Sequence, residues 1–431
     1  MFLPNNSPHK LRNFVLSLAF VVLFLGIGYK LGERRSLETV PLLLKPIIHT
    51  SQPADQRSVD FGLFWDVWGR LLKYYIDAPN IDTQKMIWGA ISGAVSSLDD
   101  PYTMFFPPKE NKEFKEDLGG SFEGIGAQLD MRDGRIIIVA PLKGTPAERA
   151  GLKPMDWILK VDGEETIDWT LTQAVTKIRG QKGTSVTLTI LHEKSQKPEE
   201  ITIVRDGILV PSVESWIKPI NTITEISDTT ASARLRTETV AYLKLSRFGD
   251  RTNEEWLKAV NEIAVALKTK QIKGLIFDLR NNPGGYLDGS VFIASEFLKN
   301  GIVVTQTNSD GSKQEYQVNR KGQLLDIPLV VLINKGSASA AEIVAGAIRD
   351  YKRGTIVGET SFGKGSVQTP QELEGGSSVH ITTGKWLLPK GDWIHKKGIT
   401  PDVMVSLNGG TEASSDAQLA RGIEVLLHIN E

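Results

Sequence analysis

Ser339 and Lys364 are the two residues whose types and surroundings best suit acyl-transfer chemistry. Ser339 stands between an apolar run that predicts a buried strand, Leu329–Ile333, and an apolar-periodic segment that predicts a helix, 343–348. At a helix N-terminus the first backbone N–H groups lack partners and the dipole favours negative charge. A nucleophile placed there is next to a ready-made oxyanion site. No histidine is close in sequence, so Lys364, between two glycines, is the local candidate for its base.

The serine also has plainer interpretations. Ser339 and Glu342 form a capping box, S-x-x-E, which by itself requires only a structural role. His380 and His395 could complete a Ser-His-Asp triad, because the order of triad residues varies among folds. However, no G-x-S-x-G elbow surrounds Ser339, and His380 lies in an alternating, strand-like stretch. We therefore interpret both histidines as structural.

The lysine lies in a glycine-rich stretch that partly matches two other motifs. Residues 358–364 nearly complete a phosphate-binding loop, but Gly365 stands where that loop needs Ser or Thr for magnesium, and the following residues are poorly suited to a helix. Ser361 and Lys364 also spell S-x-x-K, the motif of penicillin-binding enzymes. That motif needs a helix, which glycines on both sides of the lysine disfavour. Both alternatives are weak.

Taken together, these motifs resemble the carboxyl-terminal processing (tail-specific) protease family. The resemblance rests on residues 336–342 (Gly-Ser-Ala-Ser-Ala-Ala-Glu), on 362–365 (Phe-Gly-Lys-Gly) and on Gln368, and it extends from about residue 58 to the end in the family's order. It implies that Ser339 is the nucleophile, that Lys364 is the general base and that Gln368 orients the lysine.

A second loop is the candidate oxyanion site. Residues 280–285, Arg-Asn-Asn-Pro-Gly-Gly, follow the buried-strand run 274–279. In the family this glycine loop acts with the N–H of the residue after the nucleophile, here Ala340. A plain Pro-Gly turn fits the local sequence equally well. The local sequence does not distinguish Gly284 from Gly285 as the oxyanion donor. We lean to Gly285 from its distance to Ser339.

Residues 117–206 are rich in short strand-like runs separated by glycine turns, with one predicted helix, Leu171–Ile178. The runs are 136–139, Trp157–Val161, 186–191 and 201–204. The stretch resembles a PDZ domain, although Met155 stands where such domains often carry glycine. PDZ domains bind chain ends by strand addition and hold the carboxylate on loop N–H groups. The candidate loop is formed by Gly124, Ile125 and Gly126, since glycine lets backbone donors converge on one anion, while a hairpin turn is the plain alternative.

Residues 207–410 are predicted to be the peptidase catalytic domain. Strand-like 240–245, a helix over 254–267 and the strand-like 274–279 alternate, which indicates a layered α/β core. The resemblance implies a crotonase/Clp-protease-like arrangement of that core. Residues 411–431 form a predicted C-terminal helix that packs on the body or joins the N-terminal helices in a homodimer. The expected fold class is α+β multidomain: an N-terminal helical segment, a PDZ-like β-rich domain and the α/β core.

The N-terminal part divides into three predicted segments. Residues 1–30 contain an uncharged apolar stretch, 14–29, without a small-x-small cleavage site after it. We interpret it as an uncleaved signal anchor, with a cytoplasmic N-terminus and the catalytic body on the extracytoplasmic side of the cytoplasmic membrane. A buried core helix is the alternative. Residues 31–57 read as a linker, and apolar periodicity over 58–116 predicts a helical region that begins with a helix pair.

Composition narrows the remaining possibilities. A net charge of −1 gives no electrostatic support for a nucleic-acid partner. The chain has no cysteine, and its 6 histidines lack metal-ligand spacing, so we expect neither a metal site nor a cofactor. The hypothesis is a serine endopeptidase that recognises free C-termini through its PDZ domain and cleaves exported proteins. The alternative is a non-catalytic, membrane-anchored PDZ scaffold.

Overall fold

The computed structural model describes residues 60–192, 195–223, 237–406 and 416–428. The chain forms two compact units, Met1–Asp82 and Thr83–Glu431. The first unit contains the helix α2 (Gly62–Tyr74) and a short 3-10 turn, η1 (Ala78–Asn80). The second begins with α3 (Thr83–Ser96), so the predicted helix pair is confirmed. No residue of α2 is buried, although its apolar residues recur at helical spacing.

Residues 121–209 form a small β-rich domain around one apolar core. Its strands are β3 (Ala127–Arg132), β4 (Arg135–Pro141), β5 (Trp157–Val161), β6 (Glu164–Glu165), β7 (Ser185–Leu191) and β8 (Glu199–Val204), with the helices α5 (Pro146–Arg149) and α6 (Leu171–Ile178) and a separate ribbon of β2 (Ser121–Gly124) and β9 (Asp206–Leu209). Strand β7 alternates buried and at least partly exposed residues, because only one face of the sheet contacts the core. All four predicted strands and the predicted helix are confirmed.

A six-stranded sheet organises the remaining part of the second unit. Its order is β10-β11-β12-β15-β16-β19, and all neighbours except β10 and β11 are parallel. The bounds are β10 (Val213–Pro219), β11 (Thr239–Leu245), β12 (Leu275–Asp278), β15 (Leu329–Ile333), β16 (Thr355–Gly358) and β19 (Val403–Met404). Every residue of β12 and β15 is buried, as expected for parallel strands that are covered on both faces.

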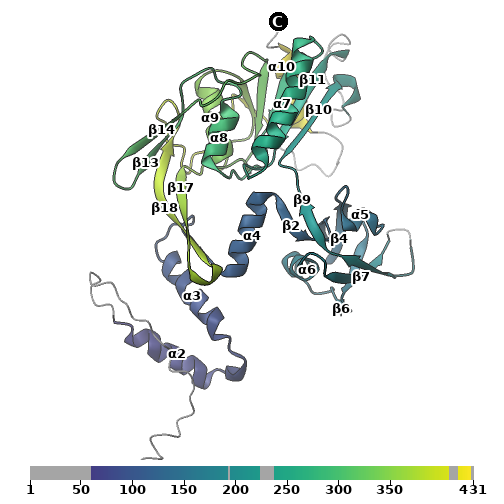
Figure 1. Cartoon of the computed structure of the whole chain (residues 1–431), viewed down its shortest axis with the longest axis vertical. Coiled ribbons are helices and arrows are strands. Elements are labelled where there is room, and N and C mark those ends of the chain that lie inside the picture. Colours follow the sequence, from purple (N-terminus) through teal and green to yellow (C-terminus); the bar gives the residue numbers. More distant parts are fainter. Residues whose placement is uncertain (1–59, 193–194, 224–236, 407–415, 429–431) are drawn as a thin grey trace, which may run out of the picture. The chain divides into compact units, whose positions relative to one another are not determined.

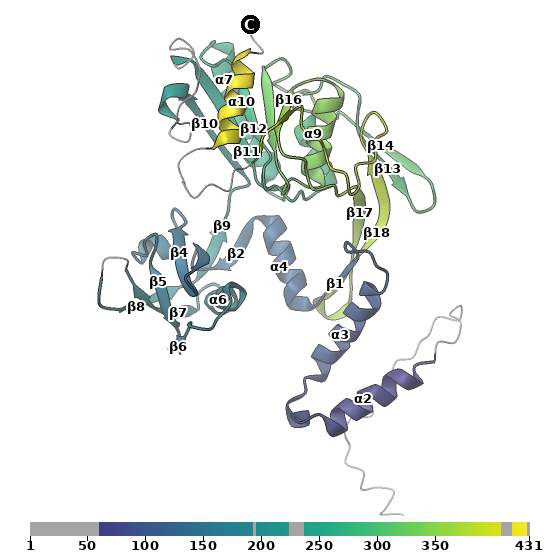
Figure 2. The same cartoon turned by 180° about the vertical axis from the view of Figure 1, so that it is seen from behind.

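Helices cover the two faces of this sheet, and alternate residues of each strand meet them. Phe277 and Val331 share one apolar cluster with α7 (Thr252–Lys268), α8 (Leu287–Ala294) and α9 (Ala340–Asp350). Ile276 and Val330 share another with α10 (Ala417–His428). Figure 1 shows α7 on the near side of the sheet, and Figure 2, from behind, shows α10 in yellow on its near side. The C-terminal helix therefore packs on the body, which resolves the alternative that the sequence left open.

A second sheet lies beside the first and carries strands that the sequence analysis mostly did not predict. It contains β1 (Met104–Phe106), β13 (Ile302–Asn308), β14 (Lys313–Gln317), β17 (Ser366–Glu372) and the long β18 (Ser378–Leu387). Strand β17 pairs along one edge of β18, whereas β1 and β13 pair with opposite ends of its other edge. On that edge, residues 381–383 of β18 lie between β1 and β13 and pair with neither strand. The helix α4 (Pro108–Gly119) follows β1 and lies mostly within the predicted helical region, 58–116.

The predicted fold class is confirmed: a mixed helix and sheet chain with a small β-rich domain and a layered α/β core. The predicted signal anchor, residues 1–30, lies outside the described residues. Within the ranges that are described, no helix combines the length and the apolar character needed to cross a bilayer.

Candidate active site

Three chain segments meet where the parallel strands of the main sheet end. The segment with Ser339 follows β15, the loop 280–285 follows β12, and the loop with Lys364 follows β16. Because parallel neighbours end at the same edge of a sheet, residues far apart in sequence come together there, which is the usual position of ligand sites in open α/β sheets. The topology therefore assembles the predicted nucleophile, base and oxyanion loop at one edge.

Ser339 has an unusual backbone. Ser339 directly precedes α9, and its φ is 54° and its ψ −116°. Residues other than glycine rarely adopt a positive φ of this kind. Such strain costs about 1–3 kcal/mol and persists only where neighbouring structure imposes it. Ala338 donates its N–H to the carbonyl of Asn282, and the buried hydroxyl of Ser337 donates to the carbonyl of Leu279. The turn that presents the serine is thus fastened to the neighbouring loop.

A buried carboxylate connects the serine to the lysine. Glu342, with no exposed surface, accepts the N–H of Ser339 at 2.9 Å and the N–H of Lys364 at 2.9 Å. It also accepts the N–H of Gly363 at 2.7 Å and the hydroxyl of Ser361 at 2.5 Å. All four partners are donors, which suits an ionised carboxylate, although burial raises the pKa of Glu342.

Sequence reasoning identified Glu342 only as half of a capping box. Its bond to the N–H of Ser339 confirms that local role. Its bonds to residues 361–364 come from the fold, and no local spacing signals them.

Burial lowers the pKa of the Lys364 amine, while the charges of Asp100 and Glu342 oppose this shift. The direction matches what a general base requires, because an unperturbed lysine is almost fully protonated near neutral pH. The loop around Lys364 is not helical, and the strand β17 follows it. The structure thus lacks the helix that either alternative motif, S-x-x-K or phosphate-binding loop, requires.

Gln368 lies on β17 two residues after Ser366. Its side-chain amide donates to the hydroxyls of Ser366 and Thr382, each at 3.0 Å. These bonds fix the amide group against β18. Its carbonyl oxygen is the acceptor that could receive a hydrogen bond from a lysine amine. The role of Gln368 in orienting Lys364 stays a prediction.

The glycine loop lies against the serine. A side-chain carbon built on Gly284 would come within 2.8 Å of the Cβ of Ser339 and 2.9 Å of the N of Ala340. The N–H of Gly284 is directed to the side chain of Asn282, at 2.8 Å. Around Gly285, Phe248 pairs instead with the carbonyl of Gly284 and the N–H of Tyr286.

The N–H of Gly284 already has an acceptor in Asn282, and the pairing with Phe248 does not use the N–H of Gly285. These hydrogen bonds favour Gly285 over Gly284 as an oxyanion donor. The N–H of Ala340 belongs to the first residue of a helix and so has no partner within that helix. The oxyanion assignment itself stays a prediction.

The two histidines occupy different surroundings. His380 packs edge-on against the rings of Phe106 and Phe114, at 4.7 Å and 4.8 Å between ring centroids, and burial lowers its pKa. His395 stacks on Trp393 at 5.1 Å. These packed positions support the structural interpretation. In the described ranges, no group of three or more His, Asp or Glu side chains is arranged to hold a metal ion.

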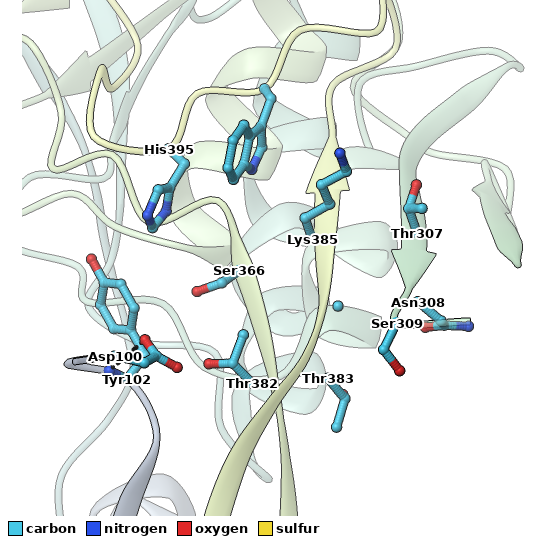
Figure 3. Close-up of a pocket in the computed structure, with 12 residues that line it drawn as sticks. Asp100, Tyr102, Thr307, Asn308, Ser309, Ser366, Thr382, Thr383, Lys385 and His395 are labelled. Atoms are coloured by element: carbon cyan, nitrogen blue, oxygen red, sulfur yellow. Dashed lines mark hydrogen bonds between the residues drawn. The ribbon is translucent and has the colours of Figure 1, made fainter. Parts of the chain in front are cut away.

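A pocket of about 350 Å³ adjoins the lysine loop. Figure 3 shows Tyr102 and His395 on one side of it, with Thr307 and Ser309 on the other. Lys364 itself lies next to this wall, since its amine is 5.2 Å from the centre of the Tyr102 ring. The sequence analysis did not identify Tyr102 as a site residue.

The predicted carboxylate-binding loop lies in the small β-rich domain, between β2 and β3. The side chain of Ile125 is buried in that domain's core. The carbonyls of Ile125 and Gly126 accept the N–H groups of Ala147 and Leu142. Gly126 has a φ of 78°, and any side chain there would collide with Thr145. The loop is therefore held by its carbonyls, and binding of a chain end by its N–H groups stays a prediction.

Comparisons with known proteins agree with this arrangement. Residues 239–405 match the model of Peptidase family S41, and residues 137–191 match that of the PDZ domain. The carboxy-terminal processing protease CtpA of Bacillus subtilis is 40% identical over 326 residues, 76% of this chain and 65% of that protein.

Two further relatives extend the comparison. A probable CtpA-like serine protease of Staphylococcus epidermidis is 34% identical over 410 residues, 93% of this chain and 75% of that protein. A provisionally named S41 protease structure from Bacteroides fragilis superimposes with a TM-score of 0.55, at 16% identity, over 87% of this chain and 99% of that one, which supports the fold alone. The chain spans about two thirds of the Bacillus subtilis relatives, 65% and 64% of their lengths.

Proposed function

Because this chain belongs to peptidase family S41, together with the carboxy-terminal processing proteases, we propose that it is a serine endopeptidase with a Ser339/Lys364 dyad. One observation carries the proposal. The carboxylate of Glu342 accepts the backbone N–H of both Ser339 and Lys364, so two distant motifs are held at one point.

The hydroxyl of Ser339 attacks the scissile carbonyl, and the neutral amine of Lys364 accepts its proton. The same proton then passes to the leaving amine, and water repeats the sequence to hydrolyse the acyl-enzyme. Burial of Lys364 supports this role, because it lowers the pKa of the amine. Gln368 orients the amine through its side-chain carbonyl.

The N–H groups of Gly285 and Ala340 receive the oxyanion that forms in this reaction. The unpaired N–H at the start of α9 and the engaged N–H of Gly284 support this choice. A donor in such a site is worth about 2.7–4 kcal/mol of transition-state stabilisation.

The substrates are proteins with free C-termini, which the PDZ domain binds through the loop of Gly124, Ile125 and Gly126. The match of residues 137–191 to the PDZ domain supports this. A peptide with an amidated C-terminus should bind more weakly than the same peptide with a free carboxylate, as measured by calorimetry. Equal affinity would exclude recognition of the carboxylate.

The test of catalysis uses an unfolded protein with an accessible C-terminus. The wild type should cleave it, and Ser339→Ala should not. Lys364→Arg should be as inactive as Lys364→Ala, because arginine keeps its charge but cannot deprotonate in proteins. Turnover by the arginine variant would exclude lysine as the base. Binding without any cleavage by the wild type would instead favour the PDZ scaffold.

We also propose that the chain is anchored in the cytoplasmic membrane by residues 1–30, with its body on the extracytoplasmic side, where it would meet exported proteins. The uncharged stretch 14–29 supports this. In fractionated cells the protein should stay with the membranes and be open to added protease from outside. A soluble, shortened protein that begins after Lys30 would show a cleaved signal.

A homodimer through the N-terminal helices is part of the same proposal. The helix α2 supports it, since it has no buried residue and exposes Leu63 and Trp65, whereas α10 already packs on the core. Sedimentation of the full chain should show a dimer that Leu63→Asp weakens. A monomer at all concentrations would contradict it.

A further inference from the structure

The segment 100–103, Asp-Pro-Tyr-Thr, precedes the α/β core in the sequence. It is hydrogen-bonded to β18, the strand that pairs with β17 after the lysine loop. The hydroxyl of Thr103 accepts the N–H of Thr382 at 3.0 Å and donates to the carboxylate of Asp100 at 2.6 Å. Asp100 also accepts the N–H of Tyr102 at 3.1 Å. The bond to Thr382 lies in the stretch of β18 that neither β1 nor β13 pairs with. Together these bonds give Asp100 and Tyr102 defined positions.

The ring of Tyr102 lies against the lysine amine. The Nζ of Lys364 is 5.2 Å from the ring centre, within the range in which an aromatic face attracts a cation. His395 packs edge-on against the same ring at 5.9 Å and stacks on Trp393. The tyrosine therefore forms part of an aromatic wall beside the amine, which Figure 3 shows for Tyr102 and His395.

Asp100 supplies a negative charge to the same place. Burial raises the pKa of its carboxyl, but hydrogen bonds from Thr103, Thr382 and backbone N–H groups outweigh burial and hold the pKa below its usual range. The carboxylate is thus ionised at neutral pH, and its charge favours the protonated form of Lys364.

We infer that segment 100–103 is a positioning element for the base: the Tyr102 ring and the Asp100 carboxylate stabilise the ammonium that forms when Lys364 accepts the proton of Ser339. A base that is only buried would be neutral but would form its cation poorly. A base with an aromatic face and an anion beside it can be neutral at rest and still accept the proton. This inference rests on the proposed function, because it takes Lys364 as the base.

Several charged or titratable groups act on this amine, and the experiment must separate them. The charge of Glu342 acts on it from α9, the charge of His380 acts from β18, and Asp100 and Tyr102 belong to the segment itself. Glu342 is fully engaged with backbone and hydroxyl donors. Asp100→Asn therefore isolates the charge of the segment while leaving these other groups in place.

The measurement is the pH dependence of kcat/KM for cleavage of an unfolded protein, whose acidic limb reports the base in the free enzyme. In Asp100→Asn the limb should move to lower pH, because loss of the anion disfavours the ammonium. The maximal kcat should fall roughly tenfold, a part of the 10²–10⁴-fold that general-base catalysis typically contributes. Mere structural damage would lower the rate without moving the limb in that direction.

Two tyrosine variants complete the test. Tyr102→Phe keeps the aromatic face, so its limb should stay in place. Tyr102→Leu keeps an apolar side chain against the amine but removes that face, so its limb should move to lower pH, and it remains informative if Asp100→Asn folds poorly. An unmoved limb in both Asp100→Asn and Tyr102→Leu would overturn the inference. The proposed function fails separately, if the wild type does not cleave or if Lys364→Arg does.

Discussion

Replacing Glu342 by glutamine should uncouple Ser339, the proposed nucleophile, from Lys364, the proposed base. The carboxylate accepts four hydrogen bonds, two on each oxygen: Ser361 and Gly363 on one, Ser339 and Lys364 on the other. A glutamine has only one acceptor oxygen, and its NH₂ group must face the other pair. The N–H groups of Ser339 and Lys364 then lose their acceptor in one orientation, and the N–H of Gly363 loses it in the other.

The cost can be estimated from these contacts. A buried N–H without a partner costs about 1–3 kcal/mol, and bonds to a charged acceptor are worth about 1.5–3 kcal/mol against about 0.5–1.5 kcal/mol for neutral ones. The arrangement that holds Ser339 beside the Lys364 loop should therefore lose about 2–4 kcal/mol of stability. At 1.36 kcal/mol per factor of ten, the fraction of molecules in that arrangement falls roughly 30- to 1,000-fold. We expect kcat to fall in that range.

The assay compares kcat with the thermal unfolding midpoint for Glu342→Gln and for a matched control. Glu296 is another fully buried glutamate, which accepts hydrogen bonds from Trp256, Arg320 and Gln323, none of which belongs to the site. Glu296→Gln should lower the unfolding midpoint and leave kcat of the folded protein nearly unchanged. If folded Glu342→Gln retains the kcat of the wild type, the reasoning about this carboxylate is refuted.

Three further predictions concern the same site. Ser337→Ala should cost about 1–3 kcal/mol of unfolding free energy, since it leaves the buried N–H of Asn334 without its hydroxyl acceptor. The variant should remain active where Ser339→Ala is dead, and an inactive but folded Ser337→Ala would contradict this. Burial lowers the pKa of Lys364 in the folded state, so the folded protein binds fewer protons than the unfolded chain between that lowered pKa and the ordinary value of 10.5. In urea titrations the wild type should therefore gain stability relative to Lys364→Met as pH rises through this window, and a constant difference would exclude the shift. Gly284→Ala should abolish activity, because the added Cβ would lie 2.8 Å from the Cβ of Ser339. Gly311→Ala is the control: Gly311 also has a positive φ but lies in open space, so this variant should lose only stability. Equal kcat/KM values for the two variants would refute the close approach of Gly284 to Ser339.

Many helices and buried strands of this protein can be predicted from its amino-acid sequence alone. Apolar runs such as Leu329–Ile333 and the 3.6-residue spacing along α7 are local patterns, and local hydrogen bonding and burial on one face translate them directly into strands and helices. The residue types at Ser339 and Lys364, with their glycine neighbours, likewise restrict the chemistry before any coordinates exist. The strands β13 and β14 were not predicted, because their residues are mostly polar and partly exposed and their pairing depends on β18.

The tertiary structure decided which residues share the site. The bonds of Glu342 to residues 361–364 and the approach of Tyr102 to Lys364 join segments that are distant in sequence, so no spacing rule could indicate them. The same is true of the choice between Gly284 and Gly285, which depends on where Asn282 and Phe248 direct their hydrogen bonds. Residue order determined most helices and buried strands and the chemical types, because these depend on near neighbours. The electrostatic environment of Lys364 arose only when the parallel sheet brought its loop ends to one edge and β18 held segment 100–103 beside them.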